Sequence, residues 1–186
     1  MISEDQLEQH ALQWFQDTGW DYLPGPTLAP DGAQPERTDC TNALNEIRQT
    51  GGLVLDSSGE IVSEYQNKLL RRQGQRGPGD EFLLWVFTNQ WNASKCERVT
   101  ISRNSQVPPF FAEFPRTQAL GAFDPSDCNF VATACAHPAK PPILVSVDTD
   151  WANHEAALTE AGITIHQLCP EDLAAMQARK RTTDSG

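Results

Sequence analysis

The chain has 186 residues, of which 39% are hydrophobic, and it carries a formal net charge of -11 at pH 7. This length suits one domain with a short appendage, and the apolar content suffices for a core and argues against wholesale disorder. The apolar runs are too short to cross a bilayer and the start, MISEDQLEQH, is not typical of a signal peptide, so we expect a soluble cytoplasmic protein without a membrane partner.

The N-terminal part of the chain differs in composition from the rest. Residues 3–22 place apolar side chains near helical spacing and predict an amphipathic helix. Residues 24–39, PGPTLAPDGAQPERTD, are rich in proline and glycine and predict a linker. We therefore interpret residues 1–40 as a helix followed by a linker.

From residue 41 onward, helical patterns alternate with short apolar strands. Helices are predicted at 41–51, 58–72, 79–91, 124–136, 151–162 and 170–177, and strands at 53–56, 97–102, 143–147 and 163–168. This alternation predicts an α/β fold with a largely parallel sheet. The fold is expected to span residues 41–178, with residues 179–186 forming a disordered tail.

Five cysteines are scattered without any C-x-x-C pair: Cys40, Cys96, Cys128, Cys135 and Cys169. Their odd number and spacing favour reduced, mostly buried thiols over a disulfide framework or a zinc site. The four histidines stand apart from any paired nucleophile, and residues 74–80, GQRGPGD, lack the P-loop spacing. Neither serine or cysteine hydrolase chemistry nor a phosphate-cradling loop is indicated.

The negative charge opposes binding to nucleic acid, because phosphate contacts depend on cationic side chains. One segment, KLLRRQGQR, is basic in spite of the negative net charge, and it contains Lys68, Arg71, Arg72 and Arg76. These four are candidate RNA-binding residues. The alternative is a solvated helix end that carries cations near its C-terminus.

Acidic residues open the apolar helix predicted at 124–136. Asp124 precedes Pro125, a pair typical of a helix N-cap and first helical position. Asp127 follows in the first turn, where the helix dipole favours a carboxylate. Both acids therefore have a structural interpretation beside any functional one.

Three further acids are candidates for a ligand site. Asp148 directly follows strand 143–147, at the carboxyl end where parallel sheets bind ligands, although such acids also cap the next helix. Asp150 is predicted as the N-cap of the following helix or as an outer ligand. Glu64 lies at the edge of the apolar face of its helix. Carboxylates are the ligands that Mg²⁺ and Mn²⁺ prefer, and such ions can activate a water for phosphodiester hydrolysis.

Four segments, in order, resemble the PIN-domain nucleases: LVLDSSGEIVSEYQNKL, GDEFLLWVFTNQ, FDPSDCNFVATACA and ILVSVDTDW. The resemblance covers about residues 41–170. It implies a three-layer α/β/α fold with a mainly parallel central sheet and a Mg²⁺- or Mn²⁺-dependent ribonuclease that cleaves single-stranded RNA, as in toxin–antitoxin systems. It also implies a homodimer and an antitoxin-like inhibitor as possible partners. By the same resemblance Glu64, Asp127 and Asp148 are the catalytic metal ligands, with Asp150 as their companion.

The chain departs from this family at its start. PIN domains begin with a strand that ends in an aspartate, and no such apolar strand is found here. Residues 38–42, TDCTN, imitate that signature and make Asp39 a candidate for the missing ligand. The first strand is thus expected to be missing or replaced.

Residues 1–37 instead resemble the extreme N-terminus of the R subunits of type I restriction enzymes. Three hypotheses follow: a PIN-type ribonuclease impaired by loss of the first-strand aspartate, a non-catalytic PIN-like binding module, and an accessory protein of a restriction–modification system.

Overall fold

A computed structural model describes residues 35–69, 78–104 and 106–183. The chain divides into two units, residues 1–38 and 39–186, and the fold below is that of the second unit. The helix predicted at 3–22 and the candidate RNA-binding residues Arg71, Arg72 and Arg76 lie outside the described residues. None of the helices within those ranges combines the length and the hydropathy that crossing a membrane requires.

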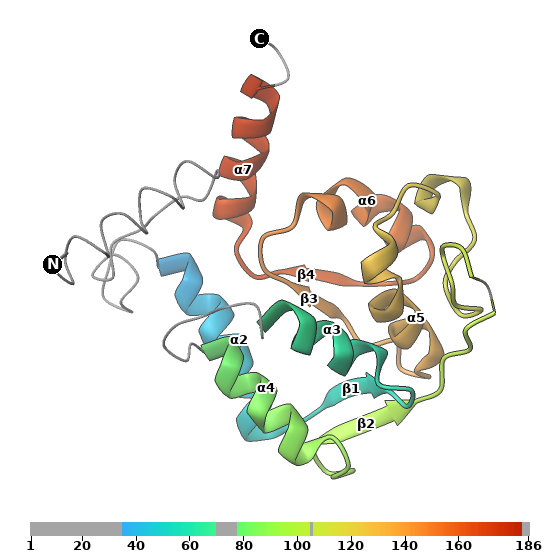
Figure 1. The fold of residues 1–186 in the computed structure, drawn as a ribbon. Coiled ribbons are helices and arrows are strands. Elements are labelled where there is room, and N and C mark those ends of the chain that lie inside the picture. The colour runs from blue at the N-terminus through green and yellow to red at the C-terminus, as the bar shows by residue number, and fades with distance from the viewer. Residues whose placement is uncertain (1–34, 70–77, 105, 184–186) are drawn as a thin grey trace, which may run out of the picture. The chain divides into compact units, whose positions relative to one another are not determined.

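Twelve helices and strands follow one another in the described residues (Figure 1). Their bounds are α2 Pro35–Thr50, β1 Leu53–Asp56, α3 Glu60–Leu69, α4 Pro78–Asn89, β2 Cys96–Val99, η2 Gln118–Leu120, η3 Pro125–Asp127, α5 Cys128–Ala136, β3 Ile143–Val145, α6 Thr149–Glu160, β4 Ile165–Gln167 and α7 Pro170–Thr183. Every helix and strand predicted between residues 41 and 177 is present, and α7 continues past the predicted end at residue 177. The α/β class is therefore confirmed.

The predicted linker is wrong at its C-terminal end. Helix α2 begins at Pro35, a residue well suited to the first turn because its missing N–H would have no helical partner there. It ends before Gly51, whose φ of 82° lies in the left-handed region. Residues 38–42 belong to this helix, and Asp39 is an exposed helical residue rather than the end of a strand.

The strands form two small parallel sheets instead of one central sheet. Strand β1 pairs with β2, with Leu53 opposite Cys96, and β3 pairs with β4, with Ile143 opposite Ile165. Helix α5 packs against both β1 and β3 (Figure 1). The expectation of a single sheet thus fails in the described residues, because neither β1 nor β2 pairs with β3 or β4 there.

Two hydrophobic clusters meet at α5. The larger one gathers buried residues of the 101–123 segment, α5, β3 and α6, including Val131 and Leu158. The smaller one lies between β1, α3, α4 and β2 and includes Leu55 and Val86. The aromatic ring of Phe130, on α5, packs against both clusters. The start of α5 is consequently held at a fixed position between the two sheets.

Candidate functional site

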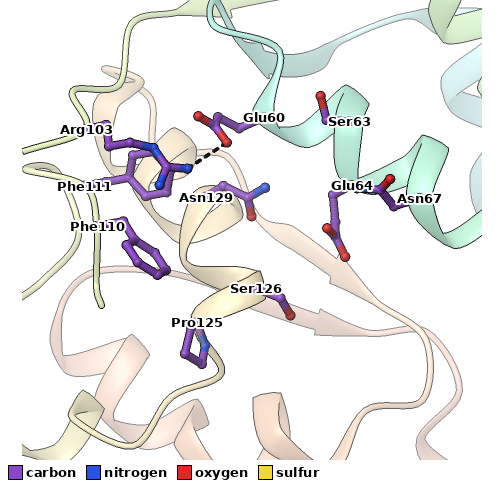
Figure 2. Close-up of a pocket in the computed structure, with 10 residues that line it drawn as sticks. All are labelled: Glu60, Ser63, Glu64, Asn67, Arg103, Phe110, Phe111, Pro125, Ser126 and Asn129. Atoms are coloured by element: carbon purple, nitrogen blue, oxygen red, sulfur yellow. Dashed lines mark hydrogen bonds and ion pairs between the residues drawn. The ribbon is translucent and has the colours of Figure 1, made fainter. Parts of the chain in front are cut away.

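An open cavity of about 330 Å³ lies between α3, the 103–111 segment and the start of α5 (Figure 2). The cavity is mixed in chemistry, with two acids, one cation, two amides, two hydroxyls and three apolar residues. Its lining consists of Glu60, Ser63, Glu64, Asn67, Arg103, Phe110, Phe111, Pro125, Ser126 and Asn129. Of the residues predicted to form the site, Glu64 is part of this lining.

Arg103 supplies the positive charge of the cavity. Its guanidinium donates to the Glu60 carboxylate at 3.0 Å, and both side chains are partly exposed. The same guanidinium lies 5.2 Å from the ring centre of Phe110 and 5.1 Å from that of Phe111. Arg103 is thus oriented by one carboxylate and two aromatic rings.

The predicted glutamate and the predicted aspartate-bearing helix are neighbours here. Figure 2 shows the Glu64 side chain extending from α3 toward the start of α5, where Ser126 and Asn129 face the same cavity. Asn129 is a polar residue only 6% exposed. Glu64 and the residues flanking Asp127 therefore border one common space.

Asp127 itself is turned into the protein. It is 5% exposed, and its carboxylate accepts a hydrogen bond of 2.8 Å from the indole N–H of Trp151, on α6. The Trp151 ring stands edge-on to Phe123 with ring centres 5.0 Å apart. This contact ties the start of α5 to the first turn of α6.

Negative charge surrounds the start of α5. Burial, together with the carboxylates of Asp127, Asp124 and Asp150, raises the pKa of the Cys128 thiol to about 11. Cys128 is therefore a neutral thiol at physiological pH and is not suited to act as a nucleophile. Two of the acids that raise this pKa, Asp127 and Asp150, are among the predicted metal ligands.

Two acids of this region, Asp124 and Asp148, cap helices. The Asp124 carboxylate accepts from the Ser126 N–H at 2.8 Å, as predicted for an N-cap before Pro125. The Asp148 carboxylate accepts from the Asp150 N–H at 2.8 Å, so Asp148 is the N-cap of α6. The prediction of Asp150 as that N-cap is wrong. Asp150 lies in the first turn of α6, and its carboxylate accepts from the Asp124 N–H at 2.9 Å.

Asp56, at the end of β1, is a buried acid that the sequence reasoning missed. It is fully buried, and its carboxylate accepts from the Ser58 hydroxyl at 2.8 Å and from the N–H groups of Glu60 and Ile61 at 2.9 Å each. Burial by itself raises the pKa of Asp56, but these hydrogen bonds outweigh it and lower that pKa below its ordinary value of 3.8. The sequence feature that could have identified Asp56 as a candidate is its position at the end of a predicted strand, the same feature by which Asp148 was chosen.

Carboxylates suit Mg²⁺ or Mn²⁺ chemically, but their placement does not make a metal centre in the described part of the chain. No three His, Cys, Asp or Glu side chains there are grouped so that they could hold an ion. Glu64 borders the cavity, Asp127 contacts Trp151, and Asp148 and Asp150 lie at the first turn of α6. The residues do not fit a metal as they are placed, so no step of a reaction is assigned to one. Of the basic residues, Lys68 lies in α3.

Comparison of the chain with models of protein families, with curated proteins and with solved structures finds no match.

Proposed function

We propose that this chain is a PIN-like protein of the metal-dependent ribonuclease type that takes single-stranded RNA into the cavity bordered by Glu64. The observation that carries the proposal is the meeting of Glu64, from α3, with the start of α5 around one open cavity. The resemblance to PIN domains requires these two elements to face each other, although they lie some sixty residues apart in the chain. Ser126, directly before Asp127, and Asn129, two residues after it, line that same space.

The acids of α6 lie next to this pair of elements. The indole of Trp151 joins the Asp127 carboxylate to the first turn of α6, where Asp148 and Asp150 stand. Glu64 thus comes from α3, Asp127 from the start of α5, and Asp148 and Asp150 from the start of α6. The resemblance assigns these four acids to Mg²⁺ or Mn²⁺, but as they are placed in the described residues they do not group around one ion, so the proposal assigns no reaction step to a metal.

A second candidate is a non-catalytic PIN-like module that binds RNA or a protein partner without cleavage. It is favoured by the hydrogen bonds that already occupy the carboxylates of Asp127, Asp148 and Asp150. An acid held by donors of its own chain is a weaker metal ligand, because those bonds must be broken or shared before an ion is held. The described helix α2 also places Asp39 away from any strand end.

The partners follow from the same proposal. Single-stranded RNA is the substrate or ligand, and an antitoxin-like inhibitor and a second copy of the chain are proposed protein partners. The proposed role in a restriction–modification system depends on residues 1–37, of which 1–34 lie outside the described residues.

The two candidates are separated by one experiment. A fluorescently labelled single-stranded RNA is incubated with the full chain in Mn²⁺, in Mg²⁺ and in a chelator, and both binding and cleavage are measured. The variants are Glu64→Gln and Asp127→Asn, which keep the shape and a hydrogen-bond acceptor, with Glu155→Gln, an exposed residue of α6, as the control.

Cleavage that needs the ion and is lost in Glu64→Gln and Asp127→Asn, but not in Glu155→Gln, supports the ribonuclease. Binding without cleavage under every condition supports the non-catalytic module. Absence of both binding and cleavage overturns the ribonuclease and the RNA-binding form of the second candidate.

A further inference from the structure

Phe110 is held at the rim of the cavity in a backbone conformation that aromatic residues rarely adopt. Its φ is 61°, in the left-handed region, where a side chain with a Cβ crowds the neighbouring carbonyl. Such a conformation is strained for a residue with a side chain, and it tends to occur at binding and active sites. Phe110 is also only partly buried. Phe110 packs in part against the larger hydrophobic cluster and also lines the cavity, so the packed side chain still presents apolar surface to that open space.

The surroundings of Phe110 combine the groups that bind an unpaired nucleotide. Its ring centre lies 5.2 Å from the Arg103 guanidinium, a cation with five N–H donors in a planar fork. One of these N–H groups serves Glu60. Two amide side chains, Asn67 and Asn129, line the same cavity, and amides can both donate to and accept from a base edge.

We infer that Phe110 and Arg103 form a subsite for one unpaired nucleobase and its phosphate, with Phe110 as the stacking surface. The inference rests on the proposed function and specifies how the RNA is held. Proteins that bind single-stranded nucleic acid stack bases on aromatic rings and contact the backbone with cations. In this proposal, stacking on Phe110 would add affinity that the net charge of -11 does not provide.

The position of Phe110 relative to Glu64 decides whether a base stacked on the ring can bring the RNA to the acidic side of the cavity. Figure 2 shows Phe110 and Arg103 on one side of the space and Glu64 on the other, with Ser126 and Asn129 between them. A base stacked on Phe110 would therefore direct its strand past the start of α5 and toward Glu64. The subsite is a positioning device, and its residues are not expected to touch the reacting atoms.

The test measures the affinity of the full chain for a labelled ten-nucleotide oligouridylate, by fluorescence anisotropy in a chelator so that no cleavage interferes. Phe110→Ala is expected to weaken binding roughly 5- to 150-fold, the effect of one lost base–aromatic stack. Phe110→Leu, which keeps apolar packing without an aromatic face, is expected to weaken it similarly. Phe110→Trp is expected to retain the wild-type affinity. Phe87→Ala, on α4 outside this cavity, is the control and should change nothing.

The outcomes separate this inference from the proposed function. Failure of the wild-type chain to bind the RNA overturns both. Wild-type binding that Phe110→Ala and Phe110→Leu leave unchanged overturns the subsite alone. Equal loss in Phe110→Trp and Phe110→Leu also overturns it, because the aromatic face then has no role. Competition by uridine monophosphate at the concentration of the oligomer would show that the occupant is a free nucleotide and would likewise overturn the RNA assignment.

Discussion

The described residues contain two parallel strand pairs, each joined through one or two helices, and in each an aspartate at or after the end of the first strand caps the next helix. In the first, β1 ends at Asp56, whose carboxylate caps α3, and the chain returns through α4 to β2. In the second, β3 is followed by Asp148, whose carboxylate caps α6, and the chain returns to β4. Both strand pairs are parallel. Asp56 is the last residue of β1, and Asp148 lies three residues past the end of β3, so each aspartate lies between a strand and the helix that its carboxylate caps.

The environments of the two aspartates differ. Asp56 is fully buried and accepts from one hydroxyl and two backbone N–H groups. Asp148 is only partly buried and accepts from the Asp150 N–H. The Asp56 carboxylate is thus buried and stabilises the fold through its hydrogen bonds, whereas part of Asp148 remains accessible to a ligand. An acid at a strand end is a candidate ligand only when the surrounding chain leaves part of its carboxylate open.

The largest expected effect is the loss of stability on truncating Asp56. Asp56→Ala removes three hydrogen bonds and leaves buried donors of Ser58, Glu60 and Ile61 without a partner, so it should lower the free energy of unfolding by about 3 kcal/mol or more. Asp148→Ala removes one helix cap and should cost about 1 kcal/mol. Urea denaturation of both variants measures the difference. Equal costs would show that the two caps are equivalent.

A smaller difference in the cost to stability is expected between alanine substitutions at two glycines with positive φ, one before β1 and one before β4. Gly51 precedes β1 and has φ 82°, and a Cβ there would lie 2.9 Å from the Lys95 Cα. Gly162 precedes β4 and has φ 79°, and its Cβ would meet only the Lys140 Nζ, at 3.0 Å. Both alanine variants incur the left-handed penalty of about 1–2 kcal/mol. Gly51→Ala should cost roughly 1 kcal/mol more, because backbone cannot move aside as a lysine end can.

The two glycine variants are compared by thermal unfolding. A higher melting temperature for Gly51→Ala than for Gly162→Ala would contradict the steric difference between the two turns.

The smallest effect concerns pH. Because the pKa of Asp56 is lower in the folded chain than its ordinary value of 3.8, the unfolded chain binds the proton more readily. The stability that Asp56 contributes is therefore fully present above about pH 4 and is lost as the pH falls below 3.8 through the folded pKa. Urea denaturation between pH 3 and pH 7 should show that the free energy of unfolding falls less steeply with decreasing pH in Asp56→Asn than in the wild type. An identical acid loss in both would contradict the assignment.

The local structure was predictable because its signals are local. Gly51 ends α2 and Asp124 with Pro125 starts the turn before α5, as the sequence indicates, because a left-handed residue and an N-cap act within a few residues. The apolar strand at 53–56 was likewise recognised from its own residues. The start of α2 at Pro35 was missed, since the prolines and glycines of residues 24–39 outweighed the helix-starting role of a single proline.

The site was predictable only in part. Glu64, Asp127 and Asp148 were expected to meet around one ion. Glu64 and residues near Asp127 border one cavity, whereas Asp127 itself contacts Trp151 and Asp148 caps α6. The cavity itself was not foreseen, because Arg103 and Phe110 come from a segment without periodic pattern and acquire their places through contacts with α3 and the core. The burial of Asp127 against Trp151 also depends on where α6 packs.

The amino-acid sequence by itself determined the order, the kind and most of the bounds of the helices and strands, along with the acids that end strands and begin helices. These features follow from hydrogen bonds and side-chain periodicity over a few residues. Only the tertiary structure decided that the strands form two pairs, that Asp56 is buried and Asp148 accessible, and that Phe110 lies across a cavity from Glu64. Those outcomes depend on packing between segments tens of residues apart, whose contacts no local pattern encodes.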